Sequence, residues 1–399
     1  MAKPTPTKKQ LDFMDWEFGF FFHYGVRTFY ETRTDWDEQP MSPAEFRPAA
    51  QDCGQWMKAA RAAGATYAIM TAKHHDGFAL WQTGTTDFGV KESPYRNGRG
   101  DVVREFTDAC REYGLKTGLY YSPAQFGSRR MNSAEYDDYF AAQITELLTN
   151  YGRIDYLWFD GCGSDGHSFD KARIVKTIRS LQPEILLFNM WDPDTRWVGN
   201  EEGYARHDQR CTVPADPGDV YPREKFLPYE CDCKFHPDSW FYTDAAARYV
   251  RSKENLKGLY DLSVGRGGNL LLNVAPDRRG LIPEEDAAIL AAFGEETRAY
   301  FAAPVCEKTG LRGTVFDFYP ETDETVSCLV LREDLTRGEY GGTFRLLYES
   351  GGDRTLLYDG AAVGHRRILR FPAVQVGRHG FFRLTFSDEI ALRDLKMYR

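Results

Sequence analysis

The chain of 399 residues lacks the features that mark membrane-embedded or disulfide-stabilised secreted proteins. No segment approaches the run of about 18 apolar residues that a membrane-spanning helix needs. The first ten residues, MAKPTPTKKQ, lack the apolar core of a secretory signal. The eight cysteines are scattered along the chain and form no disulfide framework. We therefore expect a cytoplasmic protein with reduced thiols, or a secreted or periplasmic one if a signal peptide has been removed.

Positive charge and metal-binding or phosphate-binding motifs are also scarce. The 50 Lys and Arg residues are outnumbered by 59 Asp and Glu, and the net charge of −9 argues against a nucleic acid or an anionic membrane as partner. Cys231 and Cys233 form a CxC pair with no second pair at zinc-ligand spacing. The run GRGGN at 265–269 precedes a predicted strand rather than a helix N-terminus, so it does not predict a phosphate site.

Aromatic residues, in contrast, are abundant. They make up 15% of the chain, with eight Trp, 23 Tyr and 27 Phe. Many of them pack in cores, but flat rings also suit the apolar faces of sugars. The composition therefore predicts an aromatic-lined binding cleft as well as a large core.

Strand-like and helix-like segments alternate through the first 190 residues. The predicted strands cover residues 18–23, 67–72, 117–122, 156–160 and 185–189, with 229–232 and 269–274 as later candidates. The predicted helices cover residues 53–64, 101–114, 135–152, 171–183 and 283–301. Asp101 is expected to be an N-cap, and Gly64 and Gly114 are expected to end their helices. This alternation predicts parallel strands joined by helices.

An open sheet and a (β/α)₈ barrel both fit this alternation, and the positions of the polar residues favour the barrel. These residues gather where successive strands end, which is where such a barrel builds its active site. They are His23, His74, His75, Tyr120, Tyr121, Ser122, Asp160 and Asn189. About seven strands are recognisable, so closure by an eighth is inferred. No Gly-rich loop follows the first strand, as a nucleotide-binding open sheet would require.

The character of the sequence changes after Ala303. Segments such as TVSCLVLR and GFFRLTFS alternate in polarity and are separated by Gly and Asp. We therefore predict a C-terminal antiparallel β-sandwich. The expected domains are a (β/α)₈-like catalytic barrel over 1–303 and a β-sandwich over 304–399.

Carboxylates at two strand ends suggest acid–base chemistry. Asp160 ends a strongly apolar strand, where it is either a turn residue or a catalytic group. Glu201 and Glu202 follow the next strand in an aromatic, glycine-bearing loop. Two such carboxyl groups are what a glycosidase uses, one as nucleophile and one as general acid and base, about 5–5.5 Å apart in a retaining enzyme.

The adjacent pair His74 and His75 permits three interpretations. It could ligate a metal, form a polar turn, or grip a polyhydroxylated ligand as neutral donors and acceptors. Neighbouring residues on a strand point to opposite faces, and a catalytic zinc usually has three protein ligands. A site built on this pair and the distant His23 is a weak metal candidate, so the ligand-gripping interpretation is preferred.

Seven segments of the chain carry a family resemblance. They are FGFFFHYGV (18–26), DW (35–36), TAKHHDGFALW (71–81), GLYYSP (118–123), YLWFDG (156–161), RWVGNE (196–201) and LLLNVAPDRRGLIP (270–283). In this order they resemble the α-L-fucosidases of glycoside hydrolase family 29, from about residue 11 to 301. The resemblance implies an imperfect (β/α)₈-like barrel, a C-terminal β-sandwich and hydrolysis of terminal α-L-fucose with retention.

The resemblance also implies roles for individual residues. Asp160 matches the nucleophile. Glu201 matches the acid/base of the branch specific for α-1,3 and α-1,4 linkages, with Glu202 as the rival. The residues that match sugar contacts are His23, Asp35, Trp36, His74, His75, Tyr120, Trp158 and Trp240. Tyr121 is an alternative to Tyr120, and Asp35 stands where a longer Glu is common.

The expected partner is a fucosylated oligosaccharide or glycoconjugate, with no nucleic acid and no membrane. No cofactor and no metal is expected, because two carboxyl groups and a water complete the reaction. The alternatives are a broader or α-1,2-acting fucosidase of the same family, a non-catalytic fucose-binding protein and a His-dependent metal hydrolase. The preferred glycan and the oligomeric state are left open.

Overall fold

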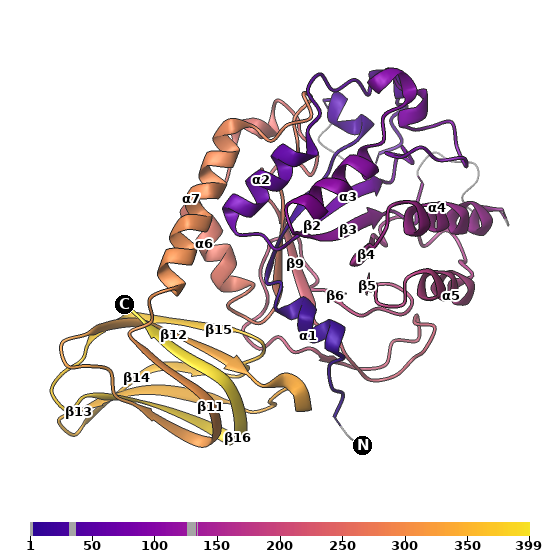
Figure 1. Ribbon diagram of the computed structural model, residues 1–399. Helices are drawn as coiled ribbons and strands as arrows, with labels where there is room; N and C mark the ends of the chain where they lie inside the picture. Colours follow the sequence, from indigo (N-terminus) through magenta and orange to yellow (C-terminus); the bar gives the residue numbers. More distant parts are fainter. Residues whose placement is uncertain (1–2, 32–36, 126–132, 134) are drawn as a thin grey trace.

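A computed structural model describes residues 3–31, 37–125, 133 and 135–399 of the chain. The first part is built around an eight-stranded parallel sheet, shown in the centre of Figure 1. Its strands, in spatial order, are β5 (Leu186–Phe188), β4 (Tyr156–Phe159), β3 (Lys116–Tyr121), β2 (Tyr67–Lys73), β1 (Phe18–Phe22), β10 (Asn269–Asn273), β9 (Tyr229–Lys234) and β6 (Arg196–Trp197). Every neighbouring pair is parallel.

A single bridge closes this sheet into a barrel. Phe188 of β5 pairs in parallel with Thr195, which immediately precedes β6. The two edge strands are thereby joined, and the predicted (β/α)₈-like barrel is confirmed. The eighth strand, β6, has only two residues and lies in a segment that was predicted as a loop. Two residues are too few to show the period-2 alternation that identifies a strand.

The barrel is imperfect because helices cover only part of its circumference. The helices are α1 (Lys8–Met14), α2 (Cys53–Ala63), α3 (Val102–Glu112), α4 (Tyr136–Asn150), α5 (Lys171–Leu181), α6 (Lys253–Leu262) and α7 (Glu284–Phe301). Between β5 and β9 the described chain has, instead of a helix, β6 and a small antiparallel hairpin of β7 (Thr212–Val213) and β8 (Lys225–Phe226). Short 3₁₀ turns occupy Val26–Phe29, Pro43–Glu45, Val90–Glu92, Tyr95–Gly98, Ala246–Arg248 and Leu335–Arg337.

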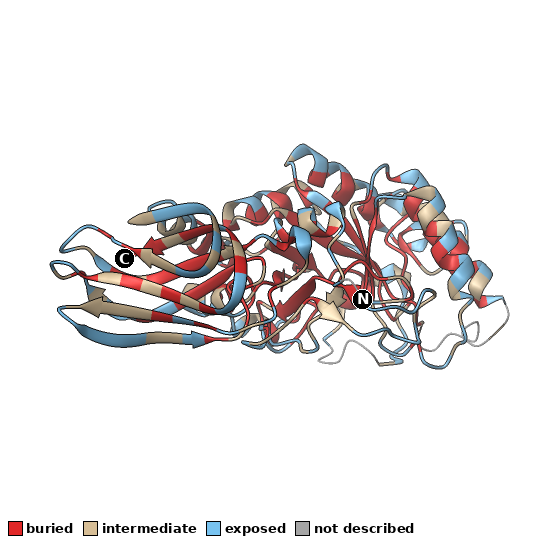
Figure 2. Ribbon diagram, turned by 90° about the horizontal axis from the view of Figure 1, so that it is seen from below, coloured by how far each residue is buried: buried red, intermediate tan, exposed pale blue. Residues whose placement is uncertain are grey.

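The helices begin and end for local chemical reasons that the sequence predicted. The Asp101 carboxylate accepts a hydrogen bond from the backbone N–H of Arg104, which confirms it as the N-cap of α3. Gly64 ends α2 at φ +90° and Gly114 follows α3 at φ +66°, conformations that favour glycine. Apolar faces of α2 and α3 pack on the barrel, and Figure 2 shows the barrel strands buried and the outer helix faces exposed.

The second part is an antiparallel six-stranded sheet that follows α7. Its strands are β11 (Cys306–Phe318), β12 (Thr325–Glu333), β13 (Phe344–Ser350), β14 (Asp353–Gly360), β15 (Arg367–Gln375) and β16 (Phe381–Tyr398). The 18-residue strand β16 pairs with β11, β12 and β13, and the sheet wraps around its own apolar core. This sandwich-like unit confirms the predicted antiparallel C-terminal fold.

The two parts share a buried interface. Cys328, Val330 and Ile368 of the C-terminal sheet belong to the same apolar cluster as the barrel helices. Glu17, which precedes β1, pairs with Arg366 at 2.6 Å and with Arg332 at 3.3 Å. Helix α7 ends at Phe301 and β11 begins at Cys306, and we propose a domain boundary near 304, between them.

Among the described residues, no helix is both long and apolar enough to cross a membrane.

Candidate active site

A cavity of about 550 Å³ opens at the C-terminal ends of the barrel strands. It is lined by Phe21, His23, His75, Tyr120, Trp158, Phe159, Asp160, Gly161, Cys162, Phe188, Asn189, Trp197, Glu201, Asp232, Lys234, Asp238, Ser239 and Trp240. A larger hollow of about 1000 Å³ lies along the C-terminal sheet, where Arg312 pairs with Glu389 and the Glu333 and Glu339 carboxylates accept from backbone N–H groups. The barrel-mouth cavity therefore combines space with convergent polar groups.

Asp160 is held by three donors at the end of β4. The Tyr120 hydroxyl donates to Oδ2 at 2.8 Å, the backbone N–H of Cys162 donates to Oδ1 at 2.9 Å, and Nε2 of His75 lies 3.3 Å from Oδ2. Burial alone would raise the pKa of Asp160, but the hydrogen bond and positive charge of His75 outweigh it and lower this pKa below 3.8. Asp160 is therefore an oriented carboxylate.

His75 carries the balancing positive charge. The Ser122 hydroxyl donates to the carbonyl oxygen of Ala124, so its oxygen accepts from Nδ1 of His75 at 2.5 Å. The other ring nitrogen, Nε2, faces the Asp160 carboxylate, so both nitrogens hold protons. Burial lowers the pKa of His75, but the hydrogen bond to Asp160 reverses this effect and raises the pKa to about 9. The expectation of two neutral imidazoles is wrong for His75, because its partners come from two other strands.

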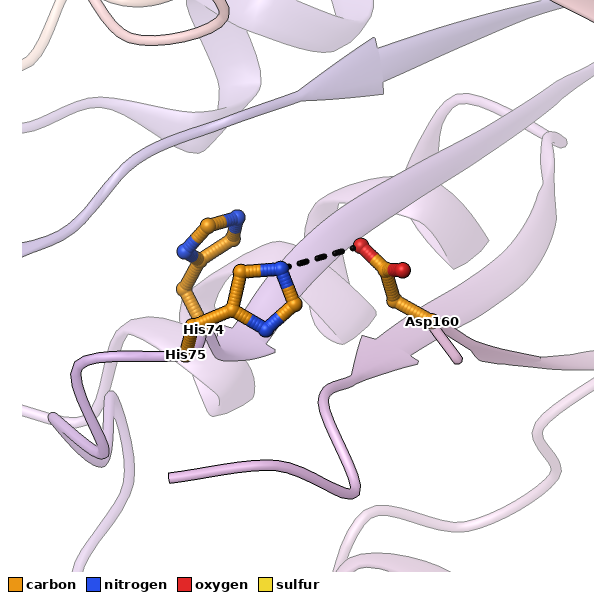
Figure 3. A group of neighbouring side chains, drawn as sticks. All are labelled: His74, His75 and Asp160. Carbon is orange, nitrogen blue, oxygen red and sulfur yellow. Dashed lines mark ion pairs between the residues drawn. The ribbon is translucent and has the colours of Figure 1, made fainter. Parts of the chain in front are cut away.

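His74 differs from its neighbour in charge and in position. Its ring stacks on Tyr120, with centroids 5.4 Å apart and planes 9° apart, and it is not among the residues that line the cavity. Burial lowers the pKa of His74 well below 6.5, and the charge of His75 lowers it further. Figure 3 shows His75 directed at Asp160 while the His74 ring lies beside it. His74 therefore supports the cavity wall as a neutral ring.

The same three side chains form a candidate metal cluster. One ligand atom each of His74, His75 and Asp160 lies within 4.8 Å of the other two. A histidine binds a metal through an unprotonated ring nitrogen. Both nitrogens of His75 donate protons, to Ser122 and to Asp160. The hydrogen-bond network thus fits an ion pair better than a metal centre.

Aromatic rings form a layered wall behind Asp160. Trp158 stacks between Tyr120 and Phe188, with centroid distances of 5.5 and 4.0 Å. Its Nε1–H donates to Glu230 at 2.8 Å, which fixes the indole in its plane. Of the two candidate tyrosines, Tyr120 faces the cavity, whereas the Tyr121 hydroxyl donates to Gln143 on the helix side of the strand.

His23 and Trp240 form a second part of the cavity wall. Their ring centroids lie 4.8 Å apart, with 33° between the planes. The side chain of Asn273, at the end of β10, contacts both residues: it accepts from the His23 ring at 2.8 Å and donates to the Trp240 carbonyl at 2.7 Å. Burial lowers the pKa of His23 to about 3, so this imidazole is neutral. The structure thus brings both predicted residues to the cavity.

Glu201 reaches the cavity from a tight turn. Asn200 organises this turn, since its side-chain oxygen accepts from the Glu202 N–H and its amide donates to the Tyr204 carbonyl, both at 3.0 Å. Gly203 at φ +75° sits against Cys233, where a Cβ atom would approach Sγ to 2.6 Å. The Glu201 carboxylate lies 3.8 Å from Nζ of Lys234, whereas Glu202 does not line the cavity.

Two expected sugar contacts, Asp35 and Trp36, lie outside the described residues. The next residue, Asp37, accepts a hydrogen bond at 2.9 Å from Arg27, and the Arg27 guanidinium lies 3.7 Å from Asp76. Asp76 in turn accepts from the Phe78 N–H at 2.8 Å. Asp76, the aspartate of the HHDG motif, therefore stabilises the loop that follows the two histidines and does not line the cavity.

The inward face of β9 carries cavity residues that were not predicted from the sequence. Glu230, Asp232 and Lys234 alternate along YECDCK, so they share one face of the strand, and the last two line the cavity. Asp232 accepts from the Trp197 Nε1–H at 2.7 Å. Burial raises the pKa of Asp232 to about 8, and the charges of Glu230 and Glu201 raise it too, against the lowering effect of the Trp197 bond. The sequence did contain a signal for these residues, since Glu230 and Asp232 stand two positions apart in a predicted strand.

Comparisons with known proteins agree on one family. The sequence model of the family described as Alpha-L-fucosidase matches residues 3–300. Alpha-L-fucosidase 1 of Arabidopsis thaliana is 32% identical over 92% of this chain and 82% of its own. The crystal structure of a putative α-L-fucosidase from Bacteroides ovatus superposes with a TM-score of 0.90 at 31% identity, over 99% of this chain and 74% of that one. A Ruminococcus gnavus glycoside hydrolase family 29 fucosidase in complex with fucose shares the fold, with a TM-score of 0.88 at 21% identity over 100% of this chain and 96% of that one.

The raised pKa of Asp232 predicts that Asp232→Asn stabilises the protein more at alkaline than at acidic pH. Between the ordinary pKa of 3.8 and the folded value of about 8, the folded state holds a proton that the unfolded state releases, so stability falls as pH rises. Asparagine has no such proton, and its oxygen still accepts from Trp197. Thermal melts at pH 5 and pH 8 should show a melting-temperature advantage that grows with pH. Asp238→Asn, at an exposed position of the cavity rim, is the matched control. A constant difference between Asp232→Asn and the native protein would contradict this prediction.

Proposed function

The chain belongs to the α-L-fucosidase family of glycoside hydrolases, and from that membership we propose the details of its reaction. We propose that it is an exo-acting enzyme that removes terminal L-fucose from oligosaccharides or glycoconjugates. The anomeric configuration is retained through a double displacement, and α-1,3 and α-1,4 linkages are preferred. Asp160 is the nucleophile and Glu201 is the acid/base.

One observation carries this proposal: an ionised Asp160 and the Glu201 side chain line the same cavity. A carboxylate that is buried and still ionised is suited to nucleophilic attack. Three donors orient Asp160, so little reorganisation precedes the attack. The side chain of Glu201 is 52% exposed and stands at the open side of the cavity, where a leaving group and then a water would enter.

The two carboxyl groups would act in turn. Asp160 forms a bond to the anomeric carbon while Glu201, protonated, gives its proton to the departing glycosidic oxygen. Glu201 then takes a proton from a water, which attacks the same carbon and releases Asp160. His75 balances the charge of Asp160 before the first step and after the second. The residues that hold the sugar hydroxyls are His23, Tyr120, whose oxygen can still accept, and His75, which shares its Nε2–H between Asp160 and the sugar. Trp158 and Trp240 offer apolar carbon surface to the ring carbons and the methyl group. His74 supports the Tyr120 ring from behind and does not contact the sugar itself.

The linkage preference is supported by the turn that carries Glu201. Its GNE segment is the feature that resembles the α-1,3/α-1,4-specific branch, and Asn200 shapes this turn through two hydrogen bonds. Beside it, Trp197, Asp232 and Lys234 form the cavity wall that the sugar next to fucose would meet. A polar wall of this kind favours a leaving sugar that presents hydroxyls at defined positions.

Asp160→Ala is expected to lower kcat by more than about 10³-fold, because the glycosyl intermediate forms on this carboxylate. Azide should restore part of the turnover of an aryl α-fucoside and give the β-fucosyl azide, which NMR identifies. Asp165→Ala, at an exposed position five residues along, should keep full activity. Normal turnover of Asp160→Ala would exclude Asp160 as nucleophile, and an α-configured azide product would exclude this mechanism.

Glu201→Ala is expected to slow oligosaccharide hydrolysis by about 10² to 10⁴-fold, while substrates with good leaving groups lose far less. The reason is that a nitrophenolate departs without a proton. Glu202→Ala is the matched control, since this exposed neighbour belongs to the same turn but does not line the cavity. The measurement is kcat of both variants and of the native enzyme on an oligosaccharide and on a nitrophenyl fucoside. If Glu202→Ala shows the leaving-group dependence instead, the acid/base is misplaced by one residue.

The linkage proposal is tested by comparing kcat/KM on 2-linked, 3-linked and 4-linked fucosyl trisaccharides. We expect the 3-linked and 4-linked sugars to be cleaved at least about tenfold faster, the difference that one hydrogen bond in the leaving-group wall can make. Asn200→Gly, which loosens the turn around Glu201, should narrow this difference. Preference for the 2-linked sugar would overturn the branch assignment and leave the fucosidase assignment standing.

A further inference from the structure

Asn273 has no role in the reaction described so far, although it ends a barrel strand beside the cavity. It is 2% exposed and lies at the C-terminal end of β10, in the segment LLLNVAP. Its side-chain oxygen accepts two hydrogen bonds from His23, one from the backbone N–H at 3.2 Å and one from ring Nδ1 at 2.8 Å. Its amide group donates to the Trp240 carbonyl at 2.7 Å. The oxygen and the amide nitrogen of this side chain thus contact two residues of one cavity wall.

These contacts determine which ring nitrogen of His23 carries the proton. The Trp240 carbonyl can only accept, so the group next to it is the amide NH₂ of Asn273 and the other group is the oxygen. The backbone N–H of His23 can only donate, which agrees with the same orientation. Nδ1 of His23 must therefore donate to the Asn273 oxygen. In a neutral imidazole the other nitrogen, Nε2, then carries a lone pair.

We propose that Asn273 is a positioning residue that makes His23 a hydrogen-bond acceptor for the bound sugar. It holds the ring as the Nδ1–H tautomer, so that Nε2 accepts from a substrate hydroxyl. Through its second bond it fixes Trp240, whose ring lies against His23, so one side chain positions a polar and an apolar contact together. This inference rests on the proposed function, in which His23 and Trp240 hold the fucose.

The charges around His23 explain why a neutral amide suits this position. Burial disfavours the imidazolium form of His23, and so do the positive charges of His75, which follows β2, and of Lys234 on β9, whereas the charge of Asp160, which follows β4, favours it. His74, whose ring lies 5.5 Å from that of His23, is neutral. A carboxylate in place of Asn273 would add a negative charge in contact with Nδ1. It would stabilise the imidazolium, and Nε2 would become a donor. The amide accepts from Nδ1 without charging the ring.

The direct test is the tautomer of His23 in the native protein. Nitrogen NMR on protein labelled with ¹⁵N-histidine reports which ring nitrogen holds the proton, and His23→Gln identifies the signal among the eight histidines. We expect a neutral ring protonated at Nδ1 near pH 7. A ring protonated at Nε2, or a cationic ring, would overturn the proposal. This readout needs no turnover, so it remains decisive even if the proposed function fails.

The functional test compares Asn273→Asp with the native enzyme. We expect KM for an aryl α-fucoside at pH 5–6 to rise about tenfold, the scale of one buried hydrogen bond lost, and to fall again as the pH is raised and His23 loses its added proton. The lost bond to the Trp240 carbonyl leaves a smaller rise in KM that does not vary with pH. Asn269→Asp is the matched control: this buried asparagine begins the same strand at the far end from the cavity, where its side chain bonds the Phe13 carbonyl and Tyr67. It should lower stability without changing the pH dependence of KM. Identical pH profiles for Asn273→Asp and the native enzyme would contradict the proposal.

Discussion

The site depends on the ion pair between His75 and Asp160, which follow β2 and β4, the two strands on either side of β3. A carboxylate in this buried position would take up a proton if nothing opposed it, because burial disfavours the charged form. His75 at 3.3 Å supplies the opposing charge, and Ser122 keeps the imidazole turned toward Asp160. The Tyr120 hydroxyl and the Cys162 N–H donate hydrogen bonds to the two oxygens of the same carboxylate. An oriented, ionised carboxylate therefore stands in front of a wall of aromatic rings.

The parallel barrel is what makes this pairing available. All eight strands run in the same direction, so the residues that follow them meet at one rim. His75 follows β2, Ser122 follows β3 and Asp160 follows β4, and each is placed by the register of its strand with the next. On the other side of the rim, the short strand β6 pairs with β9 and carries the turn of Glu201. The chemistry is assembled from residues far apart in sequence because backbone pairing fixes their strand ends.

Residues at strand ends could be predicted from sequence, and features that depend on several strands could not. The apolar runs before His23, His74 and Asp160 marked their strands clearly, and the C-terminal fold followed from the change in alternation after residue 303. The charge of His75 was predicted wrongly, since it is set by partners on β3 and β4. Strand β6 was not predicted, because two residues show no alternation, although the segment RWVGNE that contains it was identified from the family resemblance.

Asp232 and Asn273 show a second limit of the sequence. Both lie in segments that were predicted as strands, yet neither was assigned a role. Whether a strand residue faces the barrel axis depends on the register with both neighbours, and β9 and β10 pair with strands distant along the chain. The roles of these residues follow from hydrogen bonds to Trp197, His23 and Trp240, which only the folded chain brings within reach.

The central claim, that the charge of His75 keeps Asp160 ionised, is tested by the acid limb of the pH profile of kcat/KM. His75→Gln retains an N–H group that can donate toward Asp160 but removes the positive charge. Loss of that charge raises the pKa of Asp160, so the acid limb of the variant should move to higher pH than in the native enzyme. An acid limb at the same pH in both proteins would contradict the account.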